Sequence, residues 1–233
     1  PFDLIDTYPV TDLTAPRFLA KMDGRAKRSH MELDAYIALM MSVWNRRPRV
    51  ADDIAVVAAL AQSRHAPMLS HDDSQIETRD FYRAKGARIA EFPMHERVFL
   101  SAREAGDWIV LGAPNAMRGG SHLGSPGAAD MIARGLCDIL ASDYFYPAML
   151  GAIVRLLADG VGTLPDLWKL VSANPARAMG LQDRGRIAPG LRADLMLLDW
   201  PEQGTPAPLR TWVAGRGGYS ALPETITAET IPA

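Results

Sequence analysis

The middle of the chain alternates short apolar runs with amphipathic stretches. The apolar runs lie near 66–70, 87–92, 108–113 and 137–142. The amphipathic stretches lie near 74–85, 94–105, 126–134 and 147–159. Each stretch stops before a glycine, the residue that favours a left-handed helix C-cap; the glycines are Gly86, Gly106, Gly135 and Gly160. Continuous apolar runs are typical of buried parallel strands, so this pattern predicts four consecutive strand–helix units.

The flanking segments predict more helices and a small β-rich region. Helical spacing of apolar residues predicts helices near 31–44 and 52–64, and one helix over 165–179. A turn-rich link then leads to apolar runs at 193–199 and 211–214, which read as strands. Four strand–helix units fit either half of an eight-unit barrel or an open, flavodoxin-like sheet, and the pattern alone does not separate the two.

Composition narrows the class of protein. The chain has 233 residues, 48% of them hydrophobic, and a net charge of −2, which suits one α/β domain that buries a core. It has no apolar run of about 18 residues and no basic block, so we expect neither a membrane span nor a nucleic-acid partner. Cys137 is the single cysteine and fits a cytoplasmic protein. The start at Pro1 does not resemble a signal peptide, and we expect a chain cut from something longer.

Two of the predicted strands end in residues that can carry chemistry. His71, Asp72 and Asp73 follow the first apolar run, and Asp143 follows the fourth. Because α/β barrels place their chemistry at the carboxyl ends of strands, this arrangement suggests a metal-dependent hydrolase with His71 and Asp143 as ligands. The simpler alternative is a surface histidine and aspartates that cap helices.

A polar loop after the third run is a candidate anion site. It contains Arg118, Gly119, Gly120, Ser121 and His122. The glycines let backbone amides approach an anion, and the arginine adds a bidentate donor. The loop leads to a helix that we expect to begin at Ser125 and Pro126, and helix N-termini favour phosphate. A tight glycine turn without a ligand is the alternative.

Five further residues are weaker site candidates. They are Asp72, Asp73, Glu91, Asn115 and Tyr144. For Asp73 we favour a helix cap, and for Glu91 a solvated rim carboxylate is an equal alternative. Tyr144 could hydrogen-bond a substrate oxygen or simply pack.

Several of these segments resemble the C-terminal half of the amidohydrolase superfamily. More narrowly, they are similar to its diphosphatases of phosphonate metabolism, which act on alpha-D-ribose 1-methylphosphonate 5-triphosphate. The segments are Leu69–Asp73, Ala90–Pro93, Gly112–Asn115, Arg118–His122, Ser142–Tyr144, Asn174–Ala178 and Asp183–Leu195. The resemblance implies an α/β fold: the C-terminal half of a TIM-like (β/α)8 barrel over residues 1–180, with strands five to eight preceded by the helical segment 1–65. Residues 181–233 would form part of a small β-sandwich.

The resemblance also implies an activity and partners. It implies one or two divalent metal ions, zinc or else manganese or iron, and hydrolysis that releases pyrophosphate from a phosphorylated sugar. Asp143 would touch the metal and take a proton from the attacking water, and the 118–122 loop would hold the triphosphate. Strands one to four and their ligands are missing, so we expect a missing N-terminal half of the same protein, with a homo-oligomer left open. The alternatives are an amidohydrolase acting on a C–N bond, in an N-acyl amino acid or a cyclic amide, and a non-catalytic fragment or binding module.

Overall fold

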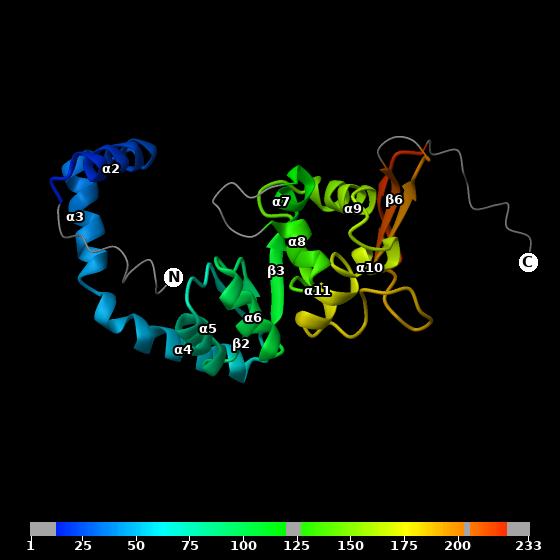
Figure 1. Ribbon diagram of the computed structural model, residues 1–233, viewed down its shortest axis with the longest axis horizontal. Helices are drawn as coiled ribbons and strands as arrows, with labels where there is room; N and C mark the ends of the chain where they lie inside the picture. Colours follow the sequence, from blue (N-terminus) through cyan, green and yellow to red (C-terminus); the bar gives the residue numbers. More distant parts are fainter. Residues whose placement is uncertain (1–12, 120–126, 203–205, 223–233) are drawn as a thin grey trace, which may run out of the picture.

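The computed structural model describes residues 13–119, 127–202 and 206–222 and shows an α/β fold (Figure 1). The strands are β1 (Met68–His71), β2 (Ala87–Glu91), β3 (Trp108–Gly112), β4 (Ile139–Ala141), β5 (Leu195–Asp199), β6 (Ala207–Val213) and β7 (Arg216–Ser220). The helices are α2 (Pro16–Arg28), α3 (Leu33–Trp44), α4 (Val50–Ser63), α5 (Ile76–Ala84), α6 (Glu96–Glu104), α7 (Ala113–Arg118), α8 (Ala128–Ala133), α9 (Ala148–Ala158), α10 (Leu164–Lys169) and α11 (Ala173–Ala178), with a short 3-10 helix η1 (Arg47–Arg49).

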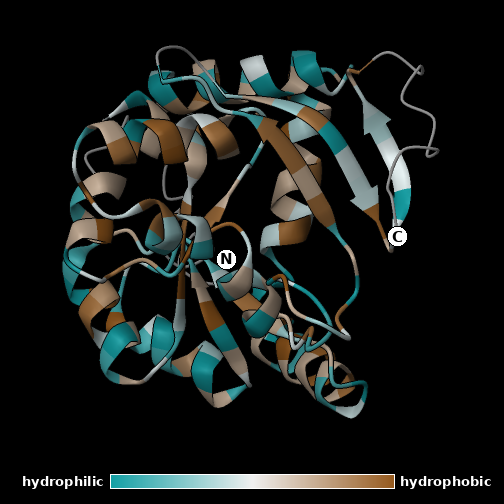
Figure 2. Ribbon diagram, turned by 90° about the vertical axis from the view of Figure 1, so that its right-hand side faces the viewer, coloured by the Kyte–Doolittle hydropathy of each residue, from teal (hydrophilic) through white to brown (hydrophobic). Residues whose placement is uncertain are grey.

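The first four strands form one parallel sheet in the order β1-β2-β3-β4. This confirms the predicted strand–helix alternation. Gly86 and Gly106 end their helices with φ values of +92° and +69°, the conformation that glycine adopts without steric cost. The strands carry hydrophobic residues along most of their length, whereas the surrounding helices show both hydrophobic and hydrophilic bands (Figure 2).

The two faces of the parallel sheet differ in what covers them. One face contributes Ala90, Ile109, Leu111 and Leu140 to the main core, which it shares with the helices. The opposite face carries a smaller cluster of buried residues, which are Ile89, Val110 and Ile139, and Ala178 of α11 packs against it. The second face is therefore only partly covered, and Leu69 at its β1 end keeps 49% of its surface exposed.

Close helix packing supports the carboxyl side of β3 and β4. A Cβ on Gly151 of α9 would lie 2.6 Å from Sδ of Met117 on α7, so the absence of a side chain lets the two helices approach. The backbone N–H of Leu140 in β4 donates to the carbonyl of Leu170 at 2.9 Å, which closes that edge of the sheet. These contacts pack α9 against α7 and join β4 to the end of α10.

Two helix predictions in this region were wrong. The predicted helix over 165–179 is two helices, because Pro175 lacks an N–H and its ring opposes a helix through the preceding turn. The run at 108–113 was expected to lead into a polar, glycine-rich loop, but residues 113–118 form α7, with Pro114 in its first turn, where proline is well tolerated.

The C-terminal strands form a separate antiparallel sheet in the order β5-β6-β7. The strands expected at 193–199 and 211–214 are present as β5 and β6, and β7 was missed because Gly217 and Gly218 interrupt its pattern. A β-sandwich needs a second sheet, and residues 206–222 with β5 supply one sheet only.

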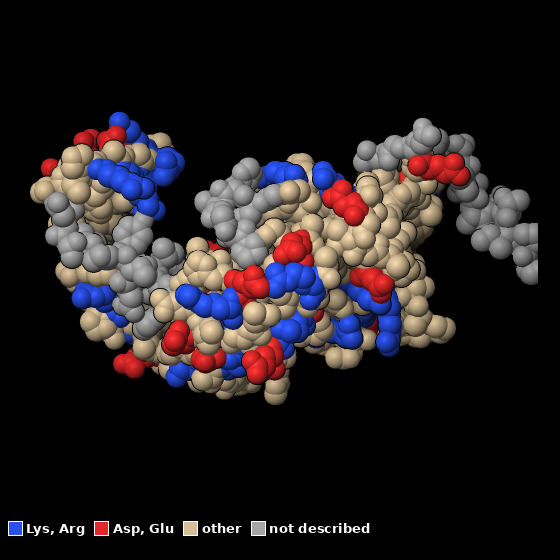
Figure 3. All heavy atoms as spheres, viewed as in Figure 1, with Lys and Arg blue, Asp and Glu red and all other residues tan. Residues whose placement is uncertain are grey.

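The N-terminal helices extend away from the parallel sheet (Figure 1). Gln62 of α4 anchors them by donating from Nε2 to the carbonyl of Lys85 at 2.9 Å. Basic side chains gather on α2, where Arg25, Lys27 and Arg28 occupy the last turn (Figure 3). Among the described residues, no helix has the length and apolar character needed to cross a membrane.

Candidate active site at the carboxyl ends of the parallel strands

His71 and Glu91 lie next to each other at the ends of β1 and β2. They are register partners, so their side chains leave the same face of the sheet. Nε2 of His71 is 4.0 Å from Oε2 of Glu91, and Nδ1 is 3.0 Å from Oδ2 of Asp72. The imidazole therefore lies between two carboxylates at the strand edge, with about half of its side chain exposed.

Three of the four strand ends turn through a left-handed residue. Asp72 after β1, Phe92 after β2 and Asp143 after β4 have φ values of +61°, +53° and +51°. Aspartate tolerates this region, but a phenylalanine there is uncommon and its strain must be offset by its surroundings. The Phe92 ring meets the His71 imidazole edge to face, with 5.1 Å between ring centroids, which restricts the imidazole.

The pKa of the Glu91 carboxyl depends on burial and on the charged groups around it. Burial raises the pKa of Glu91 above its ordinary value, and the nearby imidazole of His71 opposes that rise. The charges of Asp72 and Asp143 raise the Glu91 pKa further. Asp143 is thus close enough to the β2 end to act on it electrostatically, and the three carboxylates and one imidazole share one region.

The start of the predicted phosphate loop lies beside the β4 end. Nη2 of Arg118, the last residue of α7, donates to the hydroxyl of Tyr144. Gly119 follows in a left-handed conformation, and a Cβ there would lie 3.3 Å from Nη2 of Arg155 on α9. Two guanidinium groups therefore flank the beginning of the loop.

The remaining candidates are placed differently. Gly120, Ser121 and His122, as well as the expected helix start at Ser125 and Pro126, lie outside the described residues, and α8 begins at Ala128. Asn115 lies in the first turn of α7, directly beyond β3, and its carbonyl accepts the N–H of Gly119.

Asp73 does not occupy the capping position expected for it. The residue at the N-cap of α5 is Gln75, and the Asp73 carboxylate is buried against the guanidinium of Arg79, with 3.3 Å between Oδ2 and Nη1. Asp73 thus belongs to a buried ion pair behind the sheet edge rather than to the helix start.

The described residues do not complete a metal site. His71, Asp72, Glu91 and Asp143 are suitable donors, yet no group of three histidine, cysteine or acidic residues in this part of the chain is close enough to hold an ion. β2 and β3 separate β1 from β4, which corresponds to about 14 Å at ~4.8 Å per strand spacing. Further ligands, or a tighter curvature of the sheet, are needed before an ion could bind.

Two groups of charged residues were not expected from the sequence. Arg155 forms an i,i+4 pair with Asp159, a spacing that is common on exposed helix surfaces. The second group is the buried network around Arg79 and Asp107, whose members are far apart in sequence. Nothing in the neighbouring sequence marks either group, although Thr78 and Arg79 both lie on the buried face of α5.

The structure is that of an α/β protein with polar side chains at one edge of its parallel sheet, and comparison with known proteins gives its family. Residues 22–217 match the Amidohydrolase family, and the chain belongs to that family. An amidohydrolase of known structure has the same fold over 74% of this chain and 49% of its own, with a TM-score of 0.54 and 19% identity.

Two curated relatives are more specific. The chain is similar to the alpha-D-ribose 1-methylphosphonate 5-triphosphate diphosphatase of Escherichia coli K12, with 43% identity over 143 residues, which cover 60% of this chain and 38% of the relative. It is also similar to an adenine deaminase of Methylobacterium sp. strain 4-46, with 29% identity over 229 residues, or 94% of this chain and 39% of the relative. The chain thus spans about two fifths of the length of these relatives.

Proposed function

We propose that this chain is the C-terminal part of a metal-dependent diphosphatase that releases pyrophosphate from alpha-D-ribose 1-methylphosphonate 5-triphosphate during phosphonate catabolism in the cytoplasm. The E. coli relative, 43% identical over 143 residues, carries that activity in its name. The match spans only part of the relative, so the activity is proposed for the intact protein, in which an N-terminal half would complete the barrel.

The observation that carries the proposal is the contact between Arg118 and Tyr144. It holds a cation at the end of α7 beside the residue that follows Asp143. Hydrolysis of a triphosphate needs a fixed positive charge near the bond that breaks, because negative charge accumulates on the leaving pyrophosphate. An uncharged amide would have no such requirement.

In this proposal the residues of the candidate site divide the chemistry between them. Arg118, with the 119–122 segment, binds the leaving phosphates and offsets their negative charge. Asp143 accepts the proton of the attacking water. Barrel closure by the N-terminal strands would bring the ends of β1 and β4 around one opening, so that His71 and Asp143 could face the same ligand.

A divalent metal, with zinc preferred over manganese or iron, is part of the proposed whole protein. His71 and Asp143 would be the ligands from this chain, and the others would come from the N-terminal half. Metal analysis of the intact protein by mass spectrometry tests this without an assay. One or two equivalents are expected, and a metal-free active protein would contradict the assignment.

Arg118→Ala tests the proposed substrate class. Pyrophosphate release from the triphosphate is expected to fall by about a hundredfold in kcat/KM, because a charge-assisted donor to the leaving group is lost. Arg134→Ala is the matched control, since Arg134 caps the C-terminal end of α8, away from the proposed loop, where it pairs with Asp130 at 3.2 Å and with Glu96. If both variants keep full triphosphate turnover, the phosphate-binding assignment is wrong.

The second candidate is hydrolysis of a C–N bond, in an N-acyl amino acid or a cyclic amide. The similarity to an adenine deaminase over 94% of the chain favours it. Asp143 would serve the same purpose, but Arg118 would be dispensable. Wild-type turnover of such an amide, unchanged in Arg118→Ala, together with no pyrophosphate release, would select this candidate. Absence of both activities in the intact protein would select a non-catalytic binding module.

A further inference from the structure

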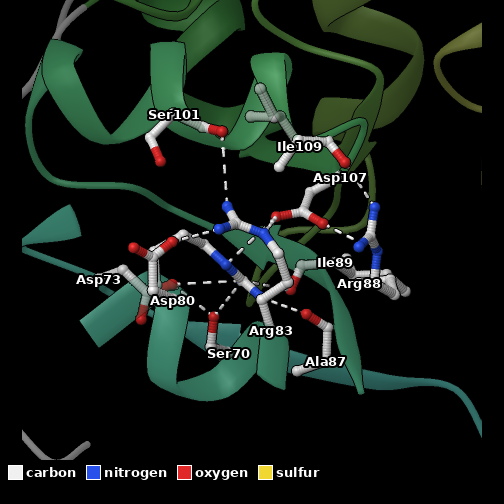
Figure 4. Close-up of polar contacts among 12 residues, drawn as sticks. Ser70, Asp73, Asp80, Arg83, Ala87, Arg88, Ile89, Ser101, Asp107 and Ile109 are labelled. Carbon is white, nitrogen blue, oxygen red and sulfur yellow. Dashed lines mark hydrogen bonds and ion pairs between the residues drawn. The ribbon is translucent and has the colours of Figure 1, made fainter. Parts of the chain in front are cut away.

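Arg79 is fully buried behind the strand edge that carries the candidate site. It lies on α5, and none of its side chain is exposed. Figure 4 shows the residues that surround it, among them Ser70, Asp73 and Asp107. A buried arginine must have its charge and its five N–H groups satisfied by the surrounding protein. The hydrogen-bond and ion-pair partners of Arg79 therefore show which residues it holds in place.

Arg79 joins the two residues that flank His71 and Asp72. Its Nη1 donates to Oγ of Ser70 at 2.6 Å and to Oδ2 of Asp73 at 3.3 Å. Ser70 itself donates to the same Asp73 oxygen at 2.5 Å. The side chains therefore close the ends of a four-residue segment, and His71 and Asp72 form its tip.

The backbone of this segment is tied to β2 as well. The N–H of Asp72 donates to the carbonyl of Glu91 at 2.9 Å, and the carbonyl of Asp73 accepts the N–H of Met94 at 3.0 Å. Arg79 adds bonds to two β2 carbonyls, those of Ala87 and Ile89. The guanidinium is thus shared between the turn after β1 and the neighbouring strand.

Asp107 fixes the orientation of the guanidinium from the other side. Its buried carboxylate Oδ2 is 3.4 Å from Nε of Arg79, and its two oxygens also meet Nε of Arg83 at 2.8 Å and Nε of Arg88 at 3.0 Å. Burial lowers the pKa of Arg79, and the charges of Asp73 and Asp107 oppose that shift, which keeps the cation in place.

We propose that Arg79, through Ser70 and Asp73, is a positioning residue that sets the direction in which His71 and Asp72 leave the sheet. The left-handed turn at Asp72, with φ of +61°, is the backbone conformation that this closure holds. The expected effect on catalysis rests on the proposed function. The expected effect on the position of His71 and Asp72 does not depend on it.

Four variants of the intact protein test the proposal. Ser70→Ala breaks the closure and keeps both charges, and Ser70→Thr restores the hydroxyl on a residue that suits a strand. Arg79→Lys keeps a cation and loses the two-pronged donor. Arg103→Met is the matched control, because it removes another helix–strand ion pair, with Asp138 at 2.9 Å, before β4.

The kinetic readout is the split between kcat and KM for triphosphate hydrolysis. Ser70→Ala and Arg79→Lys are expected to lower kcat at least about tenfold with KM within about twofold, since a misplaced group costs rate more than binding. Ser70→Thr should recover most of the rate. Arg103→Met should lower the melting temperature without changing kcat. Equal kcat in Ser70→Ala, Arg79→Lys and Arg103→Met would leave Arg79 a purely structural residue.

Crystal structures of the same variants give a readout that needs no activity. In Ser70→Ala and Arg79→Lys, Asp72 is expected to leave the left-handed region, and the His71–Glu91 separation to rise above its 4.0 Å. Unchanged geometry at both positions would overturn the inference. If the wild type releases no pyrophosphate, the proposed function fails, and the crystal structures alone decide whether Arg79 positions this edge.

Discussion

Nε2 of His71 lies 4.0 Å from Oε2 of Glu91, and the two residues are register partners on adjacent parallel strands. Two side chains that leave the same face of a sheet from register partners can contact the same ligand. The burial that raises the Glu91 pKa, together with the charge of Asp143 acting on it, indicates that this edge gathers acidic groups in a partly desolvated region. Such a region is where chemistry by carboxylates is expected.

Asp143→Asn should lower kcat for pyrophosphate release by about 10²- to 10⁴-fold with little change in KM, because an amide cannot accept the proton of water. Asn tolerates the φ of +51° at this position as well as Asp does, so the backbone turn should survive. Steady-state kinetics on the intact protein provide the measurement. Asp199→Asn, on β5 of the separate antiparallel sheet, is the control and should retain its activity. A fully active Asp143→Asn enzyme would exclude Asp143 as the base.

Asp107→Asn should destabilise the protein by about 3–5 kcal/mol, because three arginines converge on this buried carboxylate and would lose its charge. Urea unfolding followed by circular dichroism measures the free energy of unfolding. The control is Asp159→Asn, which removes an exposed i,i+4 pair with Arg155 and should cost less than about 1 kcal/mol. Similar losses in both variants would show that the buried network contributes no more than a surface pair.

Much of the fold was predictable because its signals are local. The helix ends at Gly86 and Gly106 depend only on residues next to them in the sequence. Their φ values of +92° and +69° are those expected of a glycine C-cap. The apolar run at 108–112 predicts a buried strand for the same reason. The structure has the parallel sheet that these signals indicated.

The parts that could not be predicted depend on contacts between distant residues. Arg79 and Asp107 are 28 positions apart, and nothing near either residue in the sequence marks it as buried. The contact between Arg118 and the hydroxyl of Tyr144 joins residues 26 positions apart, at the end of α7 and before α9. The assignment of His71 and Asp143 to one metal stays a prediction, since the described residues bring no group of three possible ligands together.

Gly185→Ala should destabilise the protein by more than about 2 kcal/mol. Gly185 has φ of +89°, and a Cβ there would lie 2.6 Å from Cβ of Ala176 and 3.0 Å from the carbonyl of Ser172, so both strain and overlap arise. Gly160→Ala is the matched control, because φ is +69° there and a Cβ meets nothing within 4 Å. It should cost only the strain, about 1 kcal/mol. Thermal unfolding of both variants measures the difference, and equal losses would show that the 183–186 link does not pack on α11.

Cys137 should resist alkylation in the folded protein. Burial raises the pKa of its thiol from 9.0 to about 12, so at a given pH below 9 the thiolate population falls about a thousandfold. Iodoacetamide at pH 8 should therefore label the native protein far more slowly than the urea-unfolded chain, as mass spectrometry can count. The same shift predicts a stability that is fully present below pH 9 and declines as the pH rises from 9 toward about 12, because the folded state retains a proton that the unfolded thiol has released. Cys137→Ala should remove this part of the alkaline decline. Rapid labelling of the native wild type at pH 8 would show that the region around the amino end of β4 opens readily, and would contradict the burial of this thiol.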